Sequence, residues 1–167
     1  MKKIKIQPMT AAAFAPFGDL IDSDRSFDYQ INNGNCDRYN ALATPEAIGT
    51  NAKSVVSLIR ARPYKLPLTI NVMERHPFGS QAFVPLGKVR FLVVVAEDDN
   101  GSPVEPLAFL TQPGQGVNYH RNVWHCMLSP LEEETDFLVV DRKGEEKNLE
   151  EFTFEDALLI VLSQSLR

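Results

Sequence analysis

The histidines of this chain are few, and each stands among other polar side chains that could take part in chemistry. The 167-residue sequence holds three of them, His76, His120 and His125. Imidazole, carboxylate and amide groups in one place can bind a divalent metal ion or transfer protons as general acid and base. For each histidine alone, a hydrogen-bonded imidazole in the core or on the surface is the plain alternative.

The first segment reads ERHPFGSQ and holds Glu74, His76 and Gln81. Alternate side chains of a strand share one face, so Glu74 and His76 are predicted to point the same way. After a Pro-Phe-Gly-Ser turn a new strand begins at Gln81, whose amide can approach the same point from the neighbouring strand. The alternatives are a solvated ion pair between Glu74 and Arg75, and a Gln81 side chain that only caps the turn.

The second segment, GVNYHRNVWHCML, carries the other two histidines. On a continuous strand, alternation places four side chains on one face and turns His125 away: Asn118, His120, Asn122 and Trp124. A kink at Arg121 and Asn122 would reverse that assignment. On a continuous strand, His120 is the expected partner of Glu74 and His76.

Such a group of imidazole and oxygen ligands suits a first-row divalent ion such as nickel, manganese, iron or zinc. The chain has no clustered thiolates, which argues against a closed structural zinc site. Arginines matter as well, because a guanidinium holds the carboxylate of a small organic acid through two hydrogen bonds. Several stand near predicted strand ends or polar segments, although most arginines are only surface charges: Arg38, Arg60, Arg75, Arg121 and Arg142.

The elements that must position these residues are predicted to be short strands cut by proline and glycine. Turn sequences such as HPFGS, EDDNGSP and DRKGEE separate them, and this spacing favours a barrel or sandwich. One short helix is expected at Thr10–Gly18, with Thr10 as its N-cap. The expected strands are Ile4–Gln7, Val55–Arg62, Leu68–Arg75, Gln81–Pro85, Arg90–Ala96, Ala108–Thr111, Val123–Leu128, Asp136–Asp141 and Leu158–Leu162.

Composition excludes several classes of protein and predicts a single domain over residues 1–167. The net charge is −5 and no basic block is dense, so nucleic acid is not an expected partner. The longest apolar runs, FLVVVA and ALLIVL, fall far short of the ~20 residues that cross a membrane. The chain opens without a secretion signal, and Cys36 and Cys126 lack CxxC spacing. A soluble cytoplasmic protein with two free thiols is expected.

The two polar segments resemble the paired motifs of cupin barrels, HxHxxxxE in ERHPFGSQ and PxGxxHxxxN in PGQGVNYHRNVWH. The resemblance implies a mainly β fold: a cupin-type double-stranded β-helix, or jelly-roll barrel, with one or two short helices. It also implies a metal set of Glu74, His76, Gln81 and His120. Glu74 replaces the usual first histidine and Gln81 the usual glutamate, which weakens the ligand field.

The chain is more specifically similar to the ureidoglycolate lyase family. The similarity rests on FDYQINNGNCDRY, RHPFGSQAFVPL, QGVNYHRNVWH and TDFLVVDRKG, and it extends to about residue 145. It implies cleavage of (S)-ureidoglycolate to glyoxylate and urea in allantoin breakdown. It further implies a homodimer and a divalent metal, usually nickel, with zinc or manganese as alternatives.

Elimination of urea needs a base for the substrate hydroxyl and an acid for the departing nitrogen. His76, His120 and Glu74 are expected to hold the metal or, without it, the hydroxyl, with Gln81 completing the shell. The expected proton donor is His125 or Tyr119. The substrate contacts that the resemblance suggests are Arg60 or Arg38 for the carboxylate, Asn32, Asn33 and Asn122 for the ureido group, and Trp124 at the pocket wall.

The sequence is also compatible with three alternative functions. A ureidoglycolate amidohydrolase would release ammonia and carbon dioxide, but the two-metal cluster typical of such hydrolysis is not evident. A non-catalytic cupin that binds a small acid is possible because barrels host unrelated functions. Another cupin activity, such as that of a dioxygenase or sugar isomerase, is a third alternative, and Glu74 and Gln81 disfavour the iron-oxygenase assignment.

Overall fold

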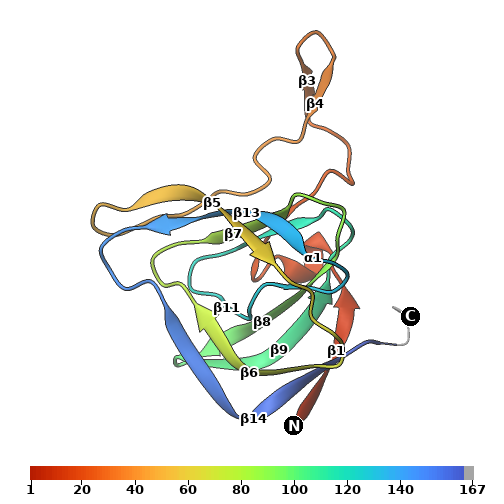
Figure 1. Ribbon diagram of the computed structural model, residues 1–167. Helices are drawn as coiled ribbons and strands as arrows, with labels where there is room; N and C mark the ends of the chain where they lie inside the picture. The colour runs from red at the N-terminus through yellow and green to blue at the C-terminus, as the bar shows by residue number, and fades with distance from the viewer. Residues whose placement is uncertain (164–167) are drawn as a thin grey trace.

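The computed structural model describes residues 1–163, and strands dominate it (Figure 1). Helix α1 (Ala11–Phe14) is a single turn, and the Thr10 hydroxyl caps it by accepting a hydrogen bond from the Ala13 amide. Phe14 at its end is fully buried. No helix among the described residues is long and apolar enough to span a membrane.

The first sheet closes on itself through six strands, in the order β11-β6-β14-β1-β9-β8 and back to β11. Strand β1 pairs in parallel with both β14 and β9, whereas β11 joins β6 to β8 in antiparallel fashion. Strand β12 (Ser129–Pro130) extends the sheet beyond β8. The ring strands are β1 (Lys2–Pro8), β6 (Leu68–Arg75), β8 (Phe91–Asp99), β9 (Ser102–Leu110), β11 (Trp124–His125) and β14 (Glu150–Val161).

The second sheet has five strands in the order β2-β10-β7-β13-β5, and β5 forms one edge. A separate hairpin, β3 (Tyr29–Ile31) with β4 (Cys36–Arg38), projects from the barrel (Figure 1). The strands of the second sheet are β2 (Gly18–Ile21), β5 (Lys53–Ala61), β7 (Gln81–Pro85), β10 (Gly116–Tyr119) and β13 (Thr135–Lys143).

Two hydrophobic clusters form the core. One lies inside the ring and includes Ile6, Ile70 and Met73. The other lies between the ring and the five-stranded sheet, where Phe91 of the ring meets Phe137 of β13 edge to face. Because side chains alternate along a strand, Met73 points into the ring and its neighbour Glu74 points towards the second sheet.

The mainly β, cupin-like barrel predicted from the sequence is confirmed. Several strands are longer than expected: β9 starts at Ser102 because Asn100 and Gly101, both at positive φ, close a tight hairpin with β8. The expected strand Val123–Leu128 is wrong, since only Trp124 and His125 are in strand β11 there. The helix is also shorter than the predicted Thr10–Gly18.

Candidate active site

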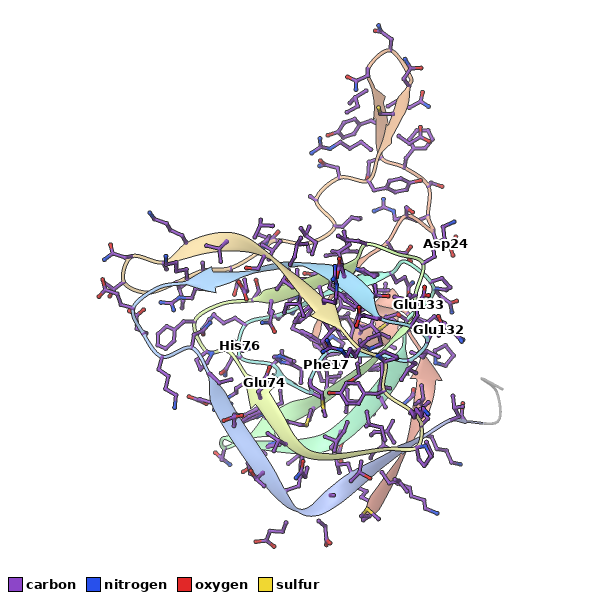
Figure 2. The ribbon with its side chains drawn as sticks, viewed as in Figure 1. Phe17, Asp24, Glu74, His76, Glu132 and Glu133 are labelled. Atoms are coloured by element: carbon purple, nitrogen blue, oxygen red, sulfur yellow. The ribbon has the colours of Figure 1, made fainter. Side chains whose placement is uncertain are left out.

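Glu74 and His125 lie opposite each other on β6 and β11, and His76 lies just beyond the end of β6. The Glu74 Oε1 atom is 3.6 Å from His125 Nε2 and 3.8 Å from His76 Nε2. One ligand atom from each residue fits within a span of 4.8 Å. Glu74 and His76 point into the space between the two sheets (Figure 2). These three residues are called the Glu-His-His cluster below.

A kink brings His125 into this cluster. Strand β10 belongs to the second sheet and ends at Tyr119, while β11 belongs to the ring. Between them Asn122 adopts φ 68°, and its amide donates a hydrogen bond of 2.9 Å to the His76 carbonyl. The chain therefore changes sheets at Asn122, and the alternation of inward and outward side chains starts afresh after it.

Both imidazoles are oriented by backbone carbonyls. His125 Nδ1 is 2.9 Å from the Val123 carbonyl oxygen, and His76 Nδ1 is 2.7 Å from that of Asn148. A carbonyl oxygen only accepts hydrogen bonds, so in the neutral rings Nδ1 carries the proton and Nε2 keeps a lone pair. Both Nε2 atoms, and Gln81 Oε1, are buried without a hydrogen-bond partner. Such unsatisfied buried atoms need an explanation, and a bound ion or substrate supplies one.

The charges within the cluster follow from its surroundings. Interaction with the His125 imidazole lowers the pKa of the Glu74 carboxyl, and burial opposes this only in part. Burial, together with repulsion from His125, lowers the pKa of His76, while the Asn148 carbonyl and Glu74 oppose the shift. Near neutral pH, Glu74 is therefore a carboxylate and His76 a neutral imidazole.

Tyr119 and Cys126 support the cluster from the protein interior. The Tyr119 ring stacks on His125, with centroids 4.4 Å apart and planes 13° from parallel. Burial raises the pKa of the Tyr119 phenol and of the Cys126 thiol, so both keep their protons. Tyr119 thus fixes the plane of His125 and keeps its phenol proton.

A second network supports the same strands on their other face. Asp98 accepts hydrogen bonds from Trp124 Nε1, at 2.8 Å, and from Arg75 Nη1, at 2.7 Å. The Arg75 guanidinium also lies over the Trp124 ring, 4.5 Å from its centroid, and donates to Glu150. Arg75 and Trp124 are the chain neighbours of Glu74 and His125, so this network ties together the strands that carry the cluster.

His120, by contrast, does not join Glu74 and His76, which corrects the face expected for the second segment. Its Nε2 atom is 3.2 Å from Asp19 Oδ1, and nearly half of its side chain is exposed. The predicted metal set with His120 is not assembled, because Tyr119 at the end of β10 faces His125 in the interior and alternation turns its neighbour His120 outward. His125 takes that place instead, and the sequence signal for this was the possible kink at Asn122.

The other predicted substrate contacts are dispersed. Arg60 forms a two-pronged ion pair with Asp136 on β13. Arg38, Asn32 and Asn33 belong to the projecting hairpin and the turn that joins its strands. Of the predicted substrate residues, Gln81 is the one beside the cluster, where its amide interacts with His76.

Asn122 and Trp124, also predicted to contact the substrate, have structural roles. Asn122 forms the kink, and Trp124 packs among the apolar side chains of the ring. The remaining candidate arginines also have protein partners: Arg142 pairs with Glu146, and Arg121 donates to the Pro77 carbonyl. Asn148 was not among the predicted site residues, because the sequence around it, EEKNLE, carries no motif that indicates a contact with His76.

The cluster therefore presents acceptors towards one point. It joins a carboxylate, two imidazole Nε2 atoms that offer lone pairs when the rings are neutral, and the nearby Gln81 carbonyl, and no lysine or arginine among residues 1–163 forms an ion pair with Glu74. Converging acceptors of this kind fit a divalent cation, because a positive charge relieves their mutual repulsion and satisfies their lone pairs.

Comparison with known proteins identifies the family of this chain. The family model described as ureidoglycolate lyase matches residues 1–161. A protein of Mesorhizobium japonicum named ureidoglycolate lyase is 54% identical over 162 residues, which cover 97% of this chain and 99% of the relative. Proteins of the same name from Chelativorans sp. and Brucella anthropi are each 53% identical, covering 98% and 93% of this chain and 99% and 92% of their own. The chain belongs to the ureidoglycolate lyase family.

Proposed function

We propose that this chain cleaves (S)-ureidoglycolate to glyoxylate and urea. Membership of the family supports the substrate, and the convergence of Glu74, His76 and His125 between the sheets supports the reaction. This convergence is the observation that carries the proposal, because it places a base and two lone-pair acceptors around one point. The predicted role of His120 in that group passes to His125.

The reaction needs little from the protein beyond a proton acceptor and correct placement. The substrate carries a hydroxyl, a carboxylate and a ureido nitrogen on one carbon. When its C–N bond breaks, the hydroxyl oxygen becomes the carbonyl of glyoxylate and the hydroxyl proton is balanced by the proton that urea gains. No water is consumed, so a single group that takes up one proton and returns it suffices.

Glu74 is the proposed proton acceptor. Its lowered pKa keeps it ionised, and its position between the two imidazoles brings the carboxylate to the centre of the cluster. Tyr119 holds the plane of His125, but its raised pKa makes the phenol a poor proton donor, so Glu74 returns the hydroxyl proton to the departing nitrogen. Burial of the cluster strengthens these polar interactions by excluding water.

A divalent cation fits the same residues. Glu74, His76 and His125 would hold it, with the Gln81 amide oxygen completing the shell. Glu74 would then be a ligand, and the ion rather than a free carboxylate would promote loss of the hydroxyl proton. Nickel is the ion that family resemblance suggests. When bound, such an ion acts as a Lewis acid that lowers the pKa of a coordinated hydroxyl and balances the substrate carboxylate.

An assay of products with and without chelator tests substrate, reaction and metal together. Equal amounts of urea and glyoxylate, lost in Glu74→Gln, would support the lyase. Ammonia and carbon dioxide would indicate an amidohydrolase, and tight binding of glyoxylate without turnover would indicate a non-catalytic barrel. Activity that survives complete removal of metal, as shown by elemental analysis, would overturn the metal assignment.

We also infer a cytoplasmic homodimer. Both cysteines are free, which suits a reducing compartment. The edge strand β5 exposes Val56 and Leu58 at 68% and 64%. Tyr29 of the projecting hairpin and Phe27, which precedes the hairpin, are exposed as well. Exposed apolar side chains on an open sheet edge favour burial against a second copy.

A further inference from the structure

Asn148 contacts the candidate active site in two places. It lies in the connection between β13 and β14 and is partly buried. Its backbone carbonyl oxygen is 2.7 Å from His76 Nδ1, and its side-chain Oδ1 accepts a hydrogen bond of 2.7 Å from the Phe78 amide. One residue therefore binds the imidazole and also the backbone two residues beyond it.

The first contact decides which nitrogen of His76 carries the proton. The Asn148 carbonyl oxygen can only accept, so Nδ1 of the neutral ring is protonated and Nε2 keeps its lone pair. The Nε2 atom is the one that faces Glu74, at 3.8 Å, and it has no hydrogen-bond partner. In the opposite tautomer Nε2 would carry a proton and could not bind a cation or accept a proton.

The second contact holds that carbonyl in place. The Phe78 amide belongs to the turn after β6, and the Phe78 carbonyl in turn accepts a hydrogen bond from the Ile48 amide. The Asn148 side chain thus joins its own backbone to the turn that carries His76. Without Oδ1 the Phe78 amide loses its partner, and the carbonyl of residue 148 loses its fixed distance to the imidazole.

We infer that Asn148 is a positioning residue, which acts through its side chain to hold His76 in the Nδ1-protonated tautomer. The inference deepens the proposed function, since it explains why His76 Nε2 is available, but the tautomer itself can be measured without any reaction. Outer partners of this kind typically affect metal affinity or activity by about 10–100-fold when removed.

Imidazole nitrogen NMR of the chelator-treated, full-length protein tests the inference directly. The chain has only three histidines, so the spectrum is simple, and the signal that disappears in His120→Gln is assigned to His120. At a pH where the rings are neutral, wild-type His76 should show a protonated Nδ1 and an unprotonated Nε2. Asn148→Ala should show a mixture of tautomers for His76, whereas Asn148→Asp, which keeps an acceptor for Phe78, should restore the wild-type signals.

Asn51→Gly is the matched control. Asn51 ties the same connection through a hydrogen bond of 2.5 Å to Glu145 and does not contact His76, and glycine suits its φ of 53°. This variant should keep the His76 tautomer and the wild-type turnover. Asn148→Ala should lose roughly 10–100-fold in kcat/KM, with Asn148→Asp within a few-fold of wild type.

The outcomes separate this inference from the proposed function. An unchanged His76 spectrum in Asn148→Ala, or a wild-type His76 protonated on Nε2, overturns the positioning role even if urea is formed normally. A shifted tautomer in Asn148→Ala in a protein that forms no urea supports the positioning role and overturns the proposed reaction. Circular dichroism of each variant confirms that the fold is retained, and the Asn148→Asp rescue distinguishes positioning from a general loosening of the connection.

Discussion

Glu74 and His125 are paired directly across two antiparallel strands, with Glu74 Oε1 at 3.6 Å from His125 Nε2. The two residues are 51 positions apart in the chain, as their numbers show. Strand pairing, rather than any local motif, therefore brings the carboxylate to the imidazole. It also makes His125, and not His120, the histidine whose loss should matter most.

Replacing each histidine of the second segment by alanine tests this assignment. His125→Ala removes one lone pair and the stacking partner of Tyr119, so we expect kcat to fall by about 10²–10⁴-fold. His120→Ala removes only a partly exposed contact with Asp19 and should have a much smaller effect. Steady-state kinetics of urea release measure both. A larger loss in His120→Ala than in His125→Ala would contradict the assignment.

The kink at Asn122 is open to a backbone test. Its φ of 68° lies in the left-handed region, where a residue with a Cβ is strained and glycine is not. We expect Asn122→Ala to lower the free energy of unfolding by about 1 kcal/mol, with Asn122→Gly close to wild type. Urea denaturation provides the measurement. Equal stabilities of the alanine and glycine variants would show that this φ does not constrain the turn.

Asp98 should stabilise the strands mainly through Trp124. Asp98→Asn keeps an acceptor for the buried Trp124 N–H, whereas Asp98→Ala leaves that N–H without a partner. Leaving a buried donor unpaired costs about 1–3 kcal/mol, so Asp98→Ala should be the less stable variant. Fluorescence of the single tryptophan during denaturation reports the difference. If Asp98→Asn and Asp98→Ala have the same denaturation midpoint, the stabilisation by Asp98 comes from its ion pair with Arg75 rather than from its hydrogen bond with Trp124.

The lowered pKa of Glu146 predicts that the protein loses stability in acid. A hydrogen bond from the Thr50 backbone amide, supported by Arg142, lowers its pKa from 4.5 to about 2. A carboxyl group whose pKa is lower in the folded state stabilises the protein fully above its unfolded pKa, and that contribution is lost as pH falls through the folded value. The unfolding free-energy difference between wild type and Glu146→Gln should therefore shrink as pH falls from 4.5 to about 2. A difference independent of pH in that range would contradict the shift.

The exposed edge of β5 predicts how the proposed dimer can be disrupted. Leu58→Glu places a charge on the exposed apolar patch of that strand and should yield monomers in sedimentation velocity. Leu162→Glu, an exposed leucine just beyond β14 of the other sheet, is the control and should leave the dimer intact. Dimers of unchanged stability in Leu58→Glu would place the interface elsewhere.

The barrel fold, part of the site and the family could be predicted from the sequence, because the signals for them are local. Alternating apolar residues and glycine-rich turns predicted a mainly β barrel, since a strand must bury one face and each turn needs particular φ values. The same alternation predicted that Glu74 and His76 face one way, and four short stretches, FDYQINNGNCDRY, RHPFGSQAFVPL, QGVNYHRNVWH and TDFLVVDRKG, indicated the family. Each of these statements depends on residues that are close together in the chain.

Tertiary structure alone decided which residues complete the site. Asn122 carries the chain from the second sheet into the ring, and this resets the alternation and exchanges His120 for His125. Asn148 reaches His76 across 72 positions, a contact that no local pattern encodes. Side-chain direction after a kink and contacts between distant strands depend on how the whole barrel closes, because they arise only when the sheets pack against each other.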